Sequence, residues 1–213
     1  MRRSIIFVVI CLFFLLVLPR NESKIPVFLI DTKPTALTKG QTGNALIIAI
    51  TFEHEQLQPF IQKHSTQPIT YLVSSDLLDR SPTLVQTLKK EQYIIGLLGS
   101  TAEQYEQSAN LLQQQLTTYE KHFKKTPMYF MTQDAYYNEP LLKALVKNQI
   151  NALAPTKLSS NNVELKKGQH VYIILDEHAT PNWQQLEQFV KRHKFSTIEE
   201  TIFDATLSSS SAP

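Results

Sequence analysis

Two short clusters of acidic and imidazole side chains are the part of this sequence that could carry out chemistry. The first follows the apolar run 45–52, and the second follows the apolar run 171–175. Their members are Glu53, His54 and Glu55, and Asp176, Glu177 and His178. Carboxylates and imidazoles grouped in this way can bind a metal ion or form a general acid and base pair. Alternatively, Glu55, Glu177 and His178 are solvated loop residues or helix N-terminal charges.

The segments that must position these clusters alternate between two kinds of hydrophobic pattern. Apolar runs predict strands at 45–52, 69–73, 93–98, 128–130, 149–153, 171–175 and 195–198. Helical periodicity and capping signals predict helices at 59–64, 81–90, 100–123, 140–147 and 180–193. Such alternation indicates the α/β class, with a parallel sheet joined by crossover helices. About seven such units fit a small (β/α) barrel, complete or incomplete, better than an open doubly wound sheet. Ligand sites would then lie at the C-terminal ends of the strands.

The helix predicted at 100–123 is the clearest of these elements. Ser100 and Glu103 have the spacing of a capping box at its start. An apolar stripe follows at Tyr105, Ala109, Leu112, Leu116, Tyr119 and Phe123. The stripe favours packing against a sheet, with a coiled-coil seam as the alternative.

Composition and the chain ends exclude several classes of function. The five glycines form no phosphate-binding loop. The only cysteine, Cys11, lies in the N-terminal apolar run, so neither a disulfide framework nor a thiolate zinc site is available to the rest of the chain. Without Arg2, Arg3 and Arg20, 18 of the 21 basic residues remain against 19 acidic ones, and nucleic acid is not an expected partner.

The N-terminal residues have the layout of an export signal. Two arginines precede an apolar run over 5–18, and no small-residue cleavage site follows it. We interpret 1–20 as a signal-anchor or signal peptide, 21–44 as a tether, 45–205 as the folded domain and 206–213 as a disordered tail. The expected location is the cell membrane with the domain outside the cytoplasm, or secretion if the signal is cleaved.

The order of short motifs over 45–203 resembles the NodB-homology polysaccharide deacetylases, carbohydrate esterase family 4. The segment Thr51-Phe52-Glu53-His54 resembles their T-F-D-D motif, and 68–73 resembles their A-T-F-F-V strand. Further matches in the same order are 81–85 (P-x-L-V), 93–96 (H-E-I-G), 126–130 (P-x-x-F), 167–175 (G-x-I-I-L) and 195–198 (F-V-T-L).

The resemblance also assigns roles to positions that this chain has changed. Glu53 occupies the position of the catalytic base, His54 that of a metal-binding aspartate, and Asp176 that of the general acid histidine. Leu98 and Ala102 fall on the two metal-binding histidines, and 131–135 replaces the R-P-P-Y-G motif. A catalytic zinc needs three protein ligands and an open position. No cofactor is therefore expected. If the barrel is open at its seam, Asp176 would lie across the pocket from His54.

Three hypotheses follow, and they lean away from an enzyme. In the first, a catalytically degenerate domain binds cell-wall glycan or an envelope protein, and Tyr136 and Tyr137 stack on sugar rings. Alternatively, both tyrosines are ordinary aromatic residues of the core or its rim. In the second, the chain is a metal-dependent hydrolase of N-acetyl or related amide groups. Its relocated site would hold zinc through His54, Glu53, Asp176 and His178. In the third, the domain is a structural partner that uses a helix face or the tether.

Overall fold

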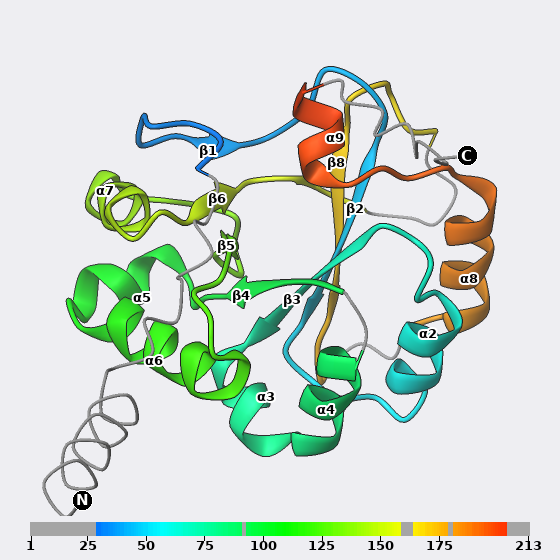
Figure 1. The fold of residues 1–213 in the computed structure, drawn as a ribbon, viewed down its shortest axis with the longest axis horizontal. Helices are drawn as coiled ribbons and strands as arrows, with labels where there is room; N and C mark the ends of the chain where they lie inside the picture. Colours follow the sequence, from blue (N-terminus) through cyan, green and yellow to red (C-terminus); the bar gives the residue numbers. More distant parts are fainter. Residues whose placement is uncertain (1–28, 91–92, 159–163, 179–180, 204–213) are drawn as a thin grey trace, which may run out of the picture.

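The chain forms a curved sheet of eight strands with most of its helices on the outer face (Figure 1). The computed structural model describes residues 29–90, 93–158, 164–178 and 181–203. The strands are β1 (Ala36–Leu37), β2 (Ala45–Ile50), β3 (Ile69–Ser74), β4 (Ile94–Leu98), β5 (Tyr129–Met131), β6 (Asn151–Leu153), β7 (Thr156–Lys157) and β8 (His170–Leu175). The helices are α2 (Leu57–Lys63), α3 (Ser75–Arg80), α4 (Pro82–Lys90), α5 (Ala102–Gln107), α6 (Leu111–Phe123), α7 (Glu139–Lys147), α8 (Trp183–Arg192) and α9 (Ile198–Phe203).

The sheet is a parallel half-barrel. Its strand order is β1-β6-β5-β4-β3-β2-β8-β7, and neighbouring strands are parallel throughout. Within the described residues β1 and β7 are the two edges, so the barrel is incomplete. The α/β class and the incomplete (β/α) barrel predicted from the alternating pattern are therefore confirmed. Residues 29–44, which the sequence analysis assigned to a tether, contribute strand β1 to one edge.

Alternating side chains divide the apolar residues of the sheet between two clusters. All six residues of β2 are buried, as expected for a central strand covered on both faces. Leu46, Ile48 and Ile50 pack outward in the cluster that includes the covering helices. Ala45, Ile47 and Ala49 face the inside of the half-barrel, together with residues such as Leu98, Met131 and Leu153. The inside of the half-barrel is therefore apolar, and the strands end around it.

The segment 195–203 differs from the strand predicted at 195–198. Phe195 is buried, but residues 198–203 form helix α9. The Thr197 hydroxyl accepts a hydrogen bond from the Glu200 N–H at 3.1 Å, and the Glu200 carboxylate accepts one from the Thr197 N–H at 2.8 Å. This reciprocal cap starts a helix. Ile198 then packs into the inner cluster, so α9 covers the half-barrel at the N-terminal ends of β2 and β8.

The helix predicted at 100–123 is two helices, α5 and α6, separated at 108–110. The capping box at its start uses Thr101 and Gln104, one residue later than predicted from Ser100 and Glu103. Most of the predicted apolar stripe is used, because Tyr105, Leu112, Leu116 and Tyr119 are buried in the outer cluster and Phe123 packs against it. Ala109 is the exception, because it lies in the break between α5 and α6 and is exposed. The packing against a sheet is therefore confirmed.

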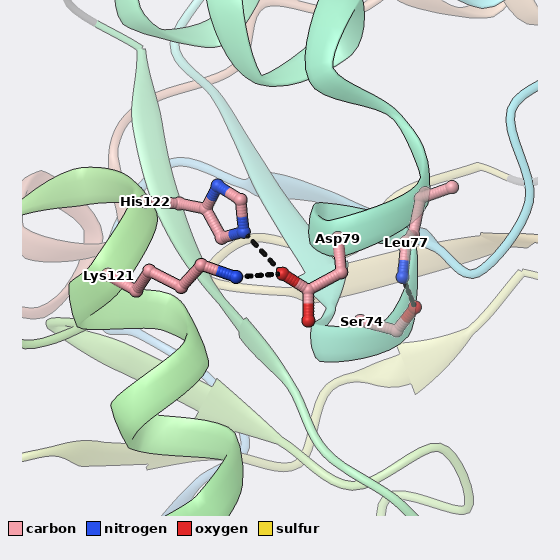
Figure 2. Close-up of polar contacts among 5 residues, drawn as sticks. All are labelled: Ser74, Leu77, Asp79, Lys121 and His122. Atoms are coloured by element: carbon pink, nitrogen blue, oxygen red, sulfur yellow. Dashed lines mark hydrogen bonds and ion pairs between the residues drawn. The ribbon is translucent and has the colours of Figure 1, made fainter.

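A polar contact joins α3 to α6 on the outer surface (Figure 2). The Asp79 carboxylate accepts hydrogen bonds from Lys121 Nζ at 2.9 Å and from His122 Nε2 at 2.8 Å. The bond from Lys121 and the bond from His122 lower the pKa of Asp79. Ser74 starts α3 by accepting a hydrogen bond from the Leu77 N–H at 3.4 Å. These contacts fix α3 directly after the C-terminal end of β3.

The apolar run 5–18 and the polar tail 206–213 lie outside the described residues, so the signal-anchor and the disordered tail stay predictions. Among the residues that are described, no helix is long and apolar enough to span a bilayer.

Candidate functional site

The two polar clusters lie next to each other at the C-terminal ends of β2 and β8. These strands pair directly, with Ile50 opposite Leu175 in the last register position. The pairing continues past the strands, because the N–H groups of Thr51 and Phe52 donate to the Leu175 carbonyl at 3.0 and 3.3 Å. His54 Nε2 then lies 2.9 Å from the backbone oxygen of Asp176. The expectation that Asp176 lies across the pocket from His54 is wrong, because β8 returns to the side of β2.

The His54 ring is held by a carbonyl and by aromatic neighbours. A carbonyl oxygen only accepts hydrogen bonds, so Nε2 carries the proton and donates it to Asp176. The ring centroid lies 5.1 Å from that of Phe52 and 6.2 Å from that of Trp183, with edge-to-face geometry in both pairs. Only Nδ1 retains a lone pair, so the imidazole offers a metal ion one nitrogen at most.

The Glu53 carboxylate is tied to the layer of helices. Its Oε1 accepts a hydrogen bond from the side-chain amide of Gln58 at 2.5 Å. The same amide nitrogen donates to Thr83 at 3.2 Å, and the amide oxygen of Gln58 accepts from Thr87 at 3.1 Å. Gln58 thus connects the end of β2 to helix α4. One oxygen of the Glu53 carboxylate is therefore already engaged in a hydrogen bond.

The second cluster is a short turn at the end of β8. Asp176 Oδ1 accepts a hydrogen bond from the His178 N–H at 3.0 Å, a local contact that shapes the turn. Asp176 is half-buried, whereas Glu177 and His178 are exposed. The side chains of His54, Glu53, Asp176 and His178 therefore share one end of the sheet.

The positions that the resemblance assigns to two metal-binding histidines are apolar and buried. Leu98 ends β4 within the inner cluster and is fully buried, and Ala102 begins α5 with 6% of its surface exposed. Met131, at the position of the motif arginine, is also fully buried. Among the described residues, no group of three or more His, Cys, Asp or Glu side chains is arranged to hold a metal ion. These residues do not fit a catalytic zinc, which takes three protein ligands.

The loop after β5 has a left-handed residue at the position where the resemblance places a glycine. Ala135 has φ of 53°, a left-handed conformation that favours glycine. It stands where the R-P-P-Y-G motif has its glycine. Asp134 fixes the loop by accepting hydrogen bonds from the N–H groups of Ala102 at 3.1 Å and Tyr136 at 3.2 Å. The motif alignment and the backbone conformation therefore agree at this loop.

Ala135→Gly is expected to stabilise the fold by about 0.5–1 kcal/mol, because relief of left-handed strain exceeds the entropy cost of glycine. Urea denaturation of the native and variant chains measures the difference. The matched control is Ala144→Gly within α7, which should destabilise by about 0.5–1 kcal/mol. If both variants lose stability equally, the conformation assigned to Ala135 is wrong.

The two predicted sugar-stacking tyrosines lie in different environments. Tyr136 is exposed over 72% of its surface and can meet a ligand. Tyr137 packs against the outer cluster, and its hydroxyl donates toward the carbonyls of Leu153 at 2.6 Å and Phe130 at 3.1 Å. Burial raises the pKa of Tyr137. Sugar stacking stays a prediction for both residues, and Tyr136 is the one whose ring is free of the core.

Sequence reasoning did not single out Gln58 or Trp183 as part of this site. Trp183 is the only tryptophan of the chain and begins α8, so its rarity was the one available signal. The amide of Gln58 has no spacing pattern that would connect it to Glu53. Both residues reach the site through packing of α2 and α8 beside the end of β2.

No family model matches the chain, and no curated protein matches it in sequence. The fold matches solved structures. A family 4 carbohydrate esterase from Bacillus anthracis superposes with a TM-score of 0.64 at 14% identity, over 80% of this chain and 88% of that chain. A CE4 family pseudoenzyme from Bacillus anthracis gives 0.65 at 12% identity, over 79% of this chain and 69% of that chain.

The chitin deacetylase from the fungal pathogen Colletotrichum lindemuthianum gives a TM-score of 0.61 at 12% identity, over 81% of this chain and 93% of that chain. The chain therefore has the fold of the polysaccharide deacetylases, as the order of its motifs predicted.

Proposed function

We propose that this chain is a catalytically degenerate polysaccharide deacetylase-like domain that binds cell-wall glycan or an envelope partner at the outer face of a bacterial membrane. The observation that carries the proposal is the packing of Leu98, Ala102 and Met131 where the deacetylase motifs place two metal ligands and an arginine. Apolar side chains in these positions leave the fold intact and remove the means of catalysis.

The loss of the metal ligands matters because zinc makes the nucleophile. A zinc-bound water has a pKa of about 7, whereas free water has a pKa of about 15.7. Of the three residues at the ligand positions, only His54 has a side chain that can bind a metal ion, and its Nε2 donates to the Asp176 carbonyl. Glu53 could accept a proton, but its carboxylate is bonded to Gln58 and has no activated water to serve.

A glycan is the favoured ligand because of the proteins that share the fold. The structural neighbours include a carbohydrate esterase and a chitin deacetylase. The exposed ring of Tyr136 follows β5, at the same end of the sheet as His54 and Asp176. The N-terminal segment 1–20 would hold the domain at the membrane, where cell-wall glycan is within reach.

The purified chain is expected to hold no stoichiometric zinc and to release no acetate from acetylated glycans. Elemental analysis after dialysis measures the metal, and an acetate assay on N-acetylglucosamine oligomers measures turnover. The alternative function is a metal-dependent hydrolase of N-acetyl groups with a relocated site, which the contact between His54 and Asp176 favours. One zinc per chain, lost in His54→Ala and accompanied by acetate release, would establish the alternative.

A further inference from the structure

A partly exposed aromatic group surrounds His54 at the end of β2. Trp183 and Phe52 each meet the His54 ring edge to face, and both are half-buried, so each keeps a solvent-accessible part. Phe60, which is 3% exposed, contacts Trp183 with a ring centroid distance of 5.6 Å and an interplanar angle of 52°. The tryptophan therefore packs against a buried ring while part of its surface meets solvent.

The position of Trp183 is fixed by the start of α8. Asn182 caps this helix by accepting a hydrogen bond from the Gln185 N–H at 3.0 Å, and Trp183 is the first residue after the cap. Within the described residues the indole ring contacts His54 and Phe60, and its N–H makes no hydrogen bond. Trp183 contacts His54, and His54 in turn contacts the backbone of the half-buried Asp176, so an apolar ring and polar groups lie close together at this end of the sheet, as in a ligand site.

We propose that Trp183, flanked by Phe52, is a stacking platform for a pyranose ring of the glycan. This inference rests on the proposed function and names the sugar subsite within it. The apolar C–H face of the sugar would lie on the indole, and its hydroxyls would meet the Trp183 N–H and the polar turn at Asp176. An axial hydroxyl projects from the face of a pyranose, so the platform favours sugars with equatorial substituents, such as β-linked N-acetylglucosamine.

The platform is separate from Tyr136. Trp183 follows β8 and Tyr136 follows β5, and β2, β3 and β4 lie between these strands. Four strand spacings correspond to about 19 Å along the sheet. Substitutions at the two aromatic residues should therefore act independently. An oligosaccharide would have to span this end of the sheet to contact both.

The test is a titration of the full-length chain with the N-acetylglucosamine hexamer, followed by calorimetry and by tryptophan emission. Because Trp183 is the only tryptophan, its emission reports on this position alone. We expect a saturable emission change with the calorimetric affinity. Trp183→Ala and Phe52→Ala should each weaken binding about fivefold, which corresponds to about 1 kcal/mol. A mannose oligomer, whose rings carry an axial hydroxyl, should bind more weakly.

The outcomes separate this inference from the proposed function. Calorimetric binding with unchanged Trp183 emission and native affinity in Trp183→Ala would overturn the platform and leave glycan binding in place. No heat of binding at millimolar hexamer would instead refute glycan binding itself. Tyr136→Ala is the matched control and should retain the emission change. If Trp183→Ala does not fold, the emission titration of the native chain decides, together with Trp183→Phe, which keeps an aromatic ring beside Phe60 and should retain most of the native affinity.

Discussion

The native chain is expected to lose about 2 kcal/mol of stability between about pH 7.5 and about pH 5 through one buried imidazole, His170. His170 is fully buried at the start of β8, where α9 covers the half-barrel. Its Nε2 lies 2.6 Å from the Thr201 hydroxyl, and that hydroxyl donates to the Ile198 carbonyl at 2.7 Å. Nε2 must therefore carry the proton that it shares with Thr201.

The other ring nitrogen is the source of the pH dependence. Nδ1 is buried and has no hydrogen-bond partner among the described residues. Protonation would place a charged, unpaired N–H there, so burial lowers the pKa of His170 from 6.5 to about 4. Above pH 6.5 both the folded and the unfolded chain hold a neutral imidazole, and no penalty applies. Between the two pKa values only the unfolded chain takes up the proton, so the stability of the folded chain decreases as the pH is lowered. The loss reaches about 3 kcal/mol below pH 4.

Urea denaturation at several pH values measures this loss, and a variant isolates the residue. His170→Gln should lose most of the pH dependence of stability, whatever its stability at neutral pH. His178→Gln, which leaves the contact between His170 and Thr201 intact, should keep the native pH dependence. Burial also lowers the pKa of His64, so part of the native pH dependence remains in the first variant. If the native chain and His170→Gln respond equally to pH, His170 is not the group responsible.

Local patterns predicted the class of fold and the location of the site, because both depend on neighbours in sequence. The apolar run that ends at Phe52 and the one that ends at Leu175 predicted two strands with polar clusters at their ends. The helix α9 was also recognisable, since Thr197 and Glu200 have the spacing of a capping box. The prediction of a strand there gave the apolar residues Phe195 and Ile198 more weight than the cap.

Features that depend on distant pairings could not be predicted in the same way. The strand order brings β8 beside β2 although more than a hundred residues separate them. Because of that placement, His54 contacts the Asp176 carbonyl and Trp183 and does not face an open edge of the sheet. The two-residue strand β1 has no periodicity of its own and exists only because Ala36 and Leu37 pair with β6. The chemistry of the site therefore depends on the topology as much as on the motifs.

A graft of three side chains is expected to convert the chain from one without zinc to one that holds one zinc per molecule. The graft is His54→Asp with Leu98→His and Ala102→His, which restores the ligand types that the deacetylase resemblance assigns to these positions. The backbone supports the test, because β2 and β4 flank β3 in the sheet and Ala135 has a left-handed conformation at the position of the motif glycine. Elemental analysis after dialysis measures the gain.

Stability distinguishes a folded metal site from loose binding. Leu98 is fully buried, so an imidazole there without metal should cost about 2–3 kcal/mol. Zinc at about 100 times its Kd should raise the free energy of unfolding by about 2.7 kcal/mol, because it binds the folded chain and not the unfolded one. Leu98→His alone is the matched control, and it should lose stability without retaining zinc. A folded triple variant that still holds no zinc would mean that the backbone at the ends of β2 and β4 has diverged together with the side chains, and the degeneracy would then be a property of the scaffold.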